Sequence, residues 1–172
     1  MSKLYVNEIV EATAGAGVAI PGHVIQATQT EITSDVYINS RTWTDVASHS
    51  ITPKSTSSKI KFTACITGQG NGANSYNWMG LRILRGSTVI FEPHTDGNGP
   101  YAFGCNTGNG AGVNVATANN CFLTYLDSPS TSTSVTYKVQ AAMYDTTVAW
   151  DFQHDAGNPD GTSIIILEEI AQ

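Results

Sequence analysis

The residues of this sequence that could ligate a metal or act as catalytic bases are four widely spaced histidines. Metal ligands must converge in space, and no HxH or HxxxH pair occurs. His94 and His154 lie in polar segments, and we interpret them as solvated loop residues. We therefore predict no metal site, with one alternative, in which a histidine on the axis of a homo-oligomer supplies a ring of ligands. The other two histidines are His23 and His49.

The acidic segments HTDGNG and HDAGNPDG are faintly similar to calcium loops, but they lack the regular oxygen ligands of an EF-hand. Gly108, Gly110 and Gly112 are spaced as in a phosphate loop, yet no helix is expected after them. No GxSxG nucleophile motif occurs. These patterns predict a protein without a cofactor and without enzymatic activity. Paired carboxylates of a glycan-degrading enzyme, which converge only in space, are the remote alternative.

Three cysteines, Cys65, Cys105 and Cys121, are an odd number at wide spacings and form no CxxC pair. We interpret them as reduced and buried, with a disulfide between two of them as the alternative.

Aromatic side chains in or beside three Gly/Asn-rich segments are the best candidates for ligand binding. Such rings could stack on sugars, while Asn and Asp side chains donate or accept hydrogen bonds. The competing interpretation, which the sequence favours slightly, is that the rings plug the ends of a β-sandwich. The candidate residues are Tyr76, Trp78, Tyr101, Phe103, Asn74 and Asp96.

The composition indicates the scaffold that positions these residues. Only 13% of the 172 residues are charged, about half the usual share, whereas the chain holds 15 Ser, 21 Thr, 12 Asn and 16 Gly. This is the composition of an all-β surface protein. The net charge of -6, without a basic patch, excludes nucleic acid as a partner, and no apolar run is long enough for membrane insertion. No secretory signal is recognisable, so we expect synthesis in a cytoplasm.

Alternating apolar residues predict most of the strands. In SKIKFTACITG the predicted inward residues are Ile60, Phe62, Ala64 and Ile66. In SVTYKVQAAM they are Val135, Tyr137, Val139, Ala141 and Met143, and in TVAWDF they are Val148, Trp150 and Phe152. In the closing SIIILEEIAQ, Ile164, Ile166 and Ile170 alternate, and Ile165 and Leu167 indicate burial of the second face too. The expected core includes Phe62, Ile66, Leu81, Ile83, Val139, Trp150 and Ile166.

Two hairpins are predicted, one around Gly86-Ser87 and one through the loop that begins at Asp127-Ser128-Pro129. No window has the helical period. Strands at this spacing, separated by Gly/Asn-rich loops, predict a two-sheet antiparallel β-sandwich of the jelly-roll type.

The pair Pro21-Gly22 separates two regions, because Pro cannot donate to a ladder and Gly weakens it. We expect residues 1–22 to be a short β segment for attachment and residues 23–172 to be the jelly-roll domain. The predicted attachment residues are Leu4, Val6, Ile9, Val18 and Ile20.

The stretch KLYVNEIVEATAGAGVAIPGHVIQ resembles the start of bacteriophage virion and tail-fibre proteins, especially marine ones. SITPKSTSSKIKFTACITGQG, LRILRGSTVI, TYLDSPSTSTSVTYKVQ and SIIILEEIAQ resemble elements of a phage fibre-tip domain, so the resemblance spans most of the chain. The loops match no pattern, and no binding residue carries over.

The resemblance implies a tumour-necrosis-factor-like jelly roll, usually a homotrimer, on the virion surface. Three functions then compete. The first is a tail-fibre or head-fibre tip for host attachment, which binds a surface glycan or protein receptor. The second is a capsid decoration subunit without a ligand, and the third is the glycan-degrading enzyme. Residues 1–22 would contact other virion proteins.

Overall fold

The structure is a computed structural model that describes residues 8–10, 20–71, 79–93, 95–96, 99–100, 117–144, 146–147, 149–153 and 161–172. Within these ranges, side chains are described except at 70–71, 95–96, 99–100 and 117–119. All regular elements among these residues are β-strands, and none of the residues is helical. The predicted all-β class is confirmed.

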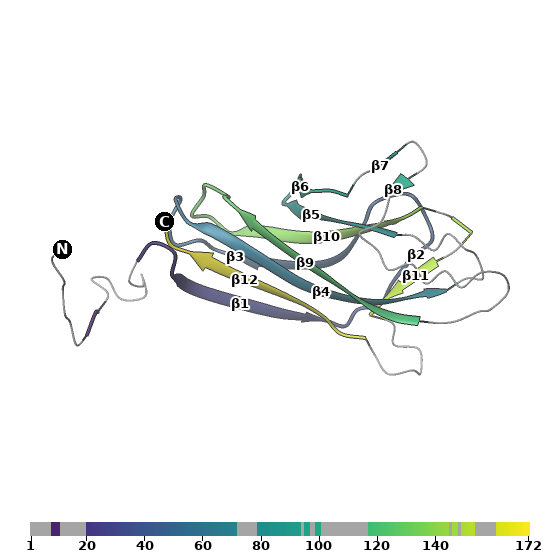
Figure 1. Cartoon of the computed structure of the whole chain (residues 1–172), viewed down its shortest axis with the longest axis horizontal. Helices are drawn as coiled ribbons and strands as arrows, with labels where there is room; N and C mark the ends of the chain where they lie inside the picture. The colour runs from purple at the N-terminus through teal and green to yellow at the C-terminus, as the bar shows by residue number, and fades with distance from the viewer. Residues whose placement is uncertain are drawn as a thin grey trace, which may run out of the picture.

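The strands of Figure 1 follow one another along the described chain. They are β1 (Val24–Ile32), β2 (Val36–Ile38), β3 (Thr44–Ile51), β4 (Lys59–Asn71), β5 (Met79–Arg85), β6 (Thr88–Phe91), β7 (Thr95–Asp96), β8 (Gly99–Pro100), β9 (Thr117–Asp127), β10 (Val135–Met143), β11 (Ala149–Phe152) and β12 (Ser163–Ile170).

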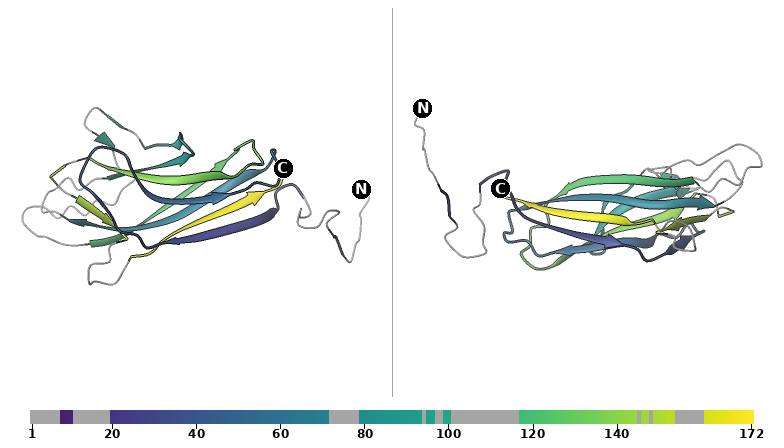
Figure 2. Two further views of the ribbon diagram at one scale, coloured as in Figure 1. Left: turned by 180° about the vertical axis from the view of Figure 1, so that it is seen from behind. Right: turned by 90° about the horizontal axis from the view of Figure 1, so that it is seen from below.

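Two antiparallel sheets form a sandwich. Sheet A has the order β1-β12-β4-β11-β2, with β9 on the other edge of β4, and sheet B has the order β3-β10-β5-β6. The long strand β4 pairs along one edge first with β12 and then with β11, so these two short strands lie end to end. β1 and β2 lie end to end beyond them. The right-hand view of Figure 2 shows β1, β12, β4 and β9 side by side.

The order of the strands is that of a jelly roll. β1-β12-β4-β9 in sheet A face β3-β10-β5-β6 in sheet B, and the chain crosses between the sheets from β3 to β4 and from β9 to β10. Because each strand alternates its side chains, one side of each sheet packs into a shared core. The predicted two-sheet sandwich is confirmed.

Large side chains from both sheets fill this core. Trp150, Phe62 and Phe152 from sheet A and Tyr137 from sheet B are fully buried. The inward residues predicted for β4 and β10 are buried, except that Val135 is half-buried against the core. Val148 lies outside the described residues.

Two sequence-based expectations are wrong. Ile166 is not a core residue, because β12 buries Ile165 and Leu167 and turns Ile164, Ile166 and Ile170 to the other side of sheet A. The segment after Asp127 does not close a hairpin either, since β9 pairs with β4 and β10 pairs with β3 and β5.

The predicted hairpin around Gly86-Ser87 is confirmed. Arg85 pairs with Thr88, and Gly86 has a positive φ of 59°, as the first central residue of a primed turn requires.

Candidate functional site

The two ends of the sandwich differ in the chain segments that are connected to them. At one end, which we call the loop end, lie the last residue of β4 (Asn71) and the first residue of β9 (Thr117), because Asn71 pairs with Ala149 and Gly70 with Thr117. At the opposite terminus end, Lys59 pairs with Ile170, near the C-terminus. Figure 1 shows β1 beginning at the same end as the C-terminus. Segment 72–78 follows β4 at the loop end and segment 101–116 precedes β9 there. Segment 154–160 instead joins β11, whose Phe152 pairs with Gly68, to β12, whose pairing with β4 begins at Cys65.

Five of the six predicted ligand-binding residues belong to the first two of these segments, and the arrangement of all six stays a prediction. The backbone of Asp96 lies in β7, but its side chain is not described. The remaining candidates lie outside the described residues: Asn74, Tyr76, Trp78, Tyr101 and Phe103.

A buried polar cluster fixes the base of the loop end. The side-chain amide of Gln153 donates to Ser163 Oγ at 2.5 Å, and the same Oγ accepts from the Thr67 backbone N at 2.9 Å. Gln153 is fully buried and has a φ of +54°, a left-handed conformation that surrounding contacts must hold in a non-glycine residue. A Cβ on Gly161 would lie 2.8 Å from Thr67 Cγ2, so this close approach requires glycine. Segment 154–160 thus leaves and rejoins a rigid base.

The terminus end carries a β-turn at Pro21-Gly22. The His23 backbone N donates to the Ile20 carbonyl at 2.9 Å, and Gly22 has a φ of +86°, as a type II turn requires. The Gly22 N donates to the Ala171 carbonyl at 2.8 Å, so the turn is also fastened to the end of the last strand. The chain therefore enters the sandwich at a fixed position and direction.

The predicted attachment residues are only partly described. Ile9 is 57% exposed and residues 8–10 are in no strand, while Ile20 is half-buried beside the turn. Leu4, Val6 and Val18 lie outside the described residues, and the division into residues 1–22 and 23–172 stays a prediction.

A buried carboxylate, Glu169, holds the loop between β3 and β4 at the terminus end. It accepts hydrogen bonds from the backbone N of Lys54 at 2.9 Å and of Ser55 at 3.2 Å, and from Gln26 Nε2 at 2.5 Å. Burial alone would raise the pKa of Glu169, but these hydrogen bonds to the charged form outweigh it and leave the pKa below its usual value.

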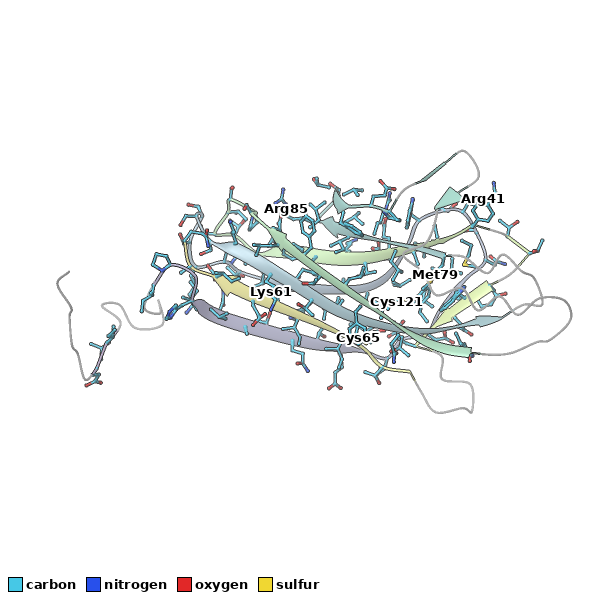
Figure 3. All side chains as sticks on the ribbon, viewed as in Figure 1. Arg41, Lys61, Cys65, Met79, Arg85 and Cys121 are labelled. Carbon is cyan, nitrogen blue, oxygen red and sulfur yellow. The ribbon has the colours of Figure 1, made fainter. Side chains whose placement is uncertain are left out.

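A second carboxylate, Asp127, joins the two sheets. Arg85 Nη1 donates to both of its oxygens, at 2.8 and 2.9 Å, and the Tyr137 hydroxyl donates at 2.7 Å. Burial, together with the hydrogen bond and the charge of Asp127, raises the pKa of Tyr137 far above its usual value. Figure 3 labels Arg85 near the end of sheet B. The sequence-based search missed both carboxylates, because their partners come from distant strands.

The outer face of sheet B, which points away from sheet A, carries a polar network. Arg82 lies 4.4 Å above the ring of Trp43 and donates from Nε to Gln140 Oε1 at 2.8 Å. Gln140 in turn donates to Asp45, which also pairs with Lys138 at 2.6 Å. Each of these polar side chains has a hydrogen-bonding or ionic partner within the network. The network is therefore typical of a solvated surface and not of a ligand-binding site.

The outer face of sheet A is different, because it carries exposed apolar side chains. Phe122 is 70% exposed and Leu126 is 50% exposed on β9. The sequence-based search also missed these residues. The available signal was the run CFLTYL, which is apolar on both sides of the strand and not on one side only.

The cysteines and histidines of the described chain form no reactive centre. Cys65 pairs with Phe122 and Ile66 with Cys121, so the two thiols lie on opposite faces of sheet A and form no disulfide with each other. His49 bonds to Thr28 Oγ1 at 3.0 Å, and burial lowers its pKa. Within the described ranges, no group of three or more His, Cys, Asp or Glu side chains is arranged to hold a metal. Cys105, His94 and His154 lie outside those ranges.

No protein-family model and no curated protein matches this chain. Among the residues that the structure describes, no helix has the length and apolar character needed to cross a membrane.

Proposed function

We propose that this protein is a structural module of a bacteriophage virion surface, fastened at its terminus end and presenting its loop end to the host. The observation that supports the proposal is that the described ends of the two regions, Ile20 on one side and Asn71 and Thr117 on the other, lie at opposite ends of the sandwich. The turn at Pro21-Gly22 sets the entry of residues 1–20 beside Ala171. The last residue of β4 and the first residue of β9, which bound two of the Gly/Asn-rich segments, lie at the other end.

Host attachment fits this arrangement better than the two alternatives. Long loops grouped on a rigid β scaffold are a common location for binding residues. A capsid decoration subunit would need the same attachment end but no ligand at the loop end. For a glycan-degrading enzyme, the two buried carboxylates Asp127 and Glu169 are unsuitable as a catalytic pair, because internal hydrogen bonds occupy them. We also propose a homotrimer, as the resemblance to fibre-tip domains implies.

The experiment that tests attachment compares phage particles carrying the full chain with particles carrying a chain without residues 1–19. This deletion retains Ile20 to Gly22 and with them the hydrogen bonds of the turn. We expect the shortened protein to melt cooperatively as a β-protein but to be absent from purified particles. Normal incorporation of the shortened protein would contradict the proposed role of the N-terminal segment.

The loop end is tested separately with the purified full chain. We expect Trp78→Ala combined with Tyr101→Ala to abolish binding to host cells, with melting unchanged. The matched control is Val89→Ala, which changes an exposed apolar residue in sheet B. Loss of binding in the control alone, or equal binding by all three proteins, would contradict a receptor site in these loops and favour the decoration alternative.

A further inference from the structure

The stretch Tyr37–Arg41, which we call the β2 corner, presents an aromatic ring, an amide and a guanidinium to solvent. Tyr37 is 59% exposed, and Asn39 and Arg41 are exposed as well. Ile38 between them is buried in the core. The corner therefore combines a fixed backbone position with three accessible side chains of different chemistry.

The β2 corner lies at the loop end of the sandwich. Ile38 pairs with Trp150 of β11, and Trp150 pairs with Gly70, two residues before segment 72–78. Figure 3 labels Arg41 at this end of the molecule. The corner is thus a described part of the end that carries the predicted ligand-binding segments.

Hydrogen bonds hold the corner against sheet B. The Met143 backbone N donates to the Ser40 carbonyl at 2.8 Å, and Arg41 Nε donates to the Tyr144 carbonyl at 3.0 Å. The Thr42 backbone N donates to Ser40 Oγ at 3.3 Å. Because contacts with both sheets fix the corner, a ligand that binds there need not order the backbone.

Arg41 has no carboxylate partner among the residues that the structure describes. In contrast, Arg82, Arg85 and Lys138 of sheet B each form a salt bridge with an Asp or Glu side chain. The printed sequence has a net charge of -6, so a cation without such a partner is unusual in this chain. The bond to the Tyr144 carbonyl uses only Nε and leaves the two terminal nitrogens of the guanidinium for a bidentate contact with a carboxylate or a phosphate.

The three exposed groups match the chemistry of an acidic saccharide. The Tyr37 ring can pack against the apolar face of a sugar ring, and the Asn39 amide can donate to and accept from hydroxyl groups. Four steps of extended chain span at most about 14 Å, so one short oligosaccharide can reach Tyr37 and Arg41 together. A protein receptor would instead require an apolar interface core, which the corner does not offer.

We propose that the β2 corner is a binding site for an acidic saccharide of the host surface, in which Arg41 binds the anionic group and Tyr37 packs against a sugar ring. This inference rests on host attachment in the proposed function and names the class of ligand. It also places part of the receptor site on residues outside the Gly/Asn-rich segments.

The test is binding of the purified full chain to immobilised polymers, measured by biolayer interferometry at low salt. Polygalacturonate carries carboxylates, poly(glycerol phosphate) carries phosphates, and dextran is neutral. We expect at least about 10-fold tighter binding to one of the two anionic polymers than to dextran, and weaker binding as salt is added. The preferred polymer identifies the anionic group as a carboxylate or a phosphate.

Variants of the corner assign this binding to its residues. Arg41→Gln should weaken binding to the preferred polymer at least about 10-fold, and Arg41→Lys should weaken it less, since it keeps the charge but not the planar fork. Tyr37→Ala should weaken binding, whereas Tyr37→Phe should retain it. The matched control is Lys54→Gln, which removes one positive charge from an exposed residue of the β3–β4 loop and should bind as the wild type does. Circular dichroism and urea unfolding establish that each variant is folded.

Three outcomes would overturn the proposal: no preference for either anionic polymer over dextran, equal binding by Arg41→Gln and the wild type, or an equal loss in Lys54→Gln. Binding to host cells separates this failure from failure of the proposed function. If wild type and Arg41→Gln bind host cells equally, the site is wrong and host attachment stands. If the wild type does not bind host cells at all, host attachment itself is wrong.

Discussion

Both outer faces of the sandwich belong to antiparallel sheets, but the side chains at their centres differ in polarity. On sheet B, Arg82, Gln140 and Asp45 form a chain of hydrogen bonds across neighbouring strands. On sheet A, the corresponding central rows present Ile166, Thr63 and Phe122. A face of paired charges is stable in water, whereas an apolar face gains free energy when another surface covers it.

The difference indicates that the polarity of the outward-facing side chains decides which face of the sandwich is covered by protein. Full burial of a side chain such as Phe122 or Leu126 contributes about 1.5–3 kcal/mol. No comparable gain is available on sheet B, because covering its ionic network would remove charged groups from water. The comparison therefore predicts that one face is covered by protein and that the other remains solvated.

The largest expected effect on stability comes from removing the carboxylate of Asp127, which links sheet A to sheet B. Asp127→Ala would leave the buried Tyr137 hydroxyl without its acceptor and Arg85 without its carboxylate. We expect a loss of about 3 kcal/mol in the free energy of unfolding, measured with urea. Asp127→Asn can still accept from Tyr137 and should lose less. Equal losses in the two variants would show that charge, and not the hydrogen bond to Tyr137, dominates.

A smaller effect is the loss of stability at low pH, which we assign to the buried carboxylate Glu169 and not to the carboxylates of the outer faces. Because the pKa of Glu169 is lower in the folded state than in the unfolded chain, its contribution is complete above the unfolded value. That contribution is lost as the pH falls through the folded pKa. We expect the unfolding free energy of the wild type to decline below about pH 4.3, and that of Glu169→Gln to decline less.

The pKa of Asp45 on sheet B is also lowered: burial opposes this shift, and hydrogen bonds from Lys138 and Gln140 outweigh burial. Because the Asp45 side chain is 45% exposed, its share of the acid dependence should be small. An Asp45→Asn variant that removed most of the acid dependence would contradict the assignment to Glu169.

The smallest expected effect is on the network of sheet B. Lys138→Ala removes an ion pair whose side chains are 33% and 45% exposed, and should cost at most about 1 kcal/mol of stability. The solution mass should not change. A change in mass would show that sheet B also contributes to assembly and would remove the contrast between the faces.

The sequence predicted the sandwich well where one side of a strand is apolar and the other is polar, as in β4 and β10. It failed at β12, because Ile164 to Leu167 are apolar on both sides and alternation alone cannot select the inner one. It also failed after Asp127, since a turn motif does not show whether the next strand pairs or crosses to the other sheet. The apolar face was missed for the same reason as Ile166. It is visible only once the register of three distant segments is known.

The most direct test of the contrast is hydroxyl-radical footprinting of the full chain at 0.1 and 100 μM, read by mass spectrometry. It compares Phe122 on sheet A with Trp43 on sheet B in the same sample. We expect Phe122 to be protected at the higher concentration, while oxidation of Trp43 stays constant. Unchanged oxidation of Phe122, or protection of Trp43 instead, would contradict the prediction that protein covers the outer face of sheet A.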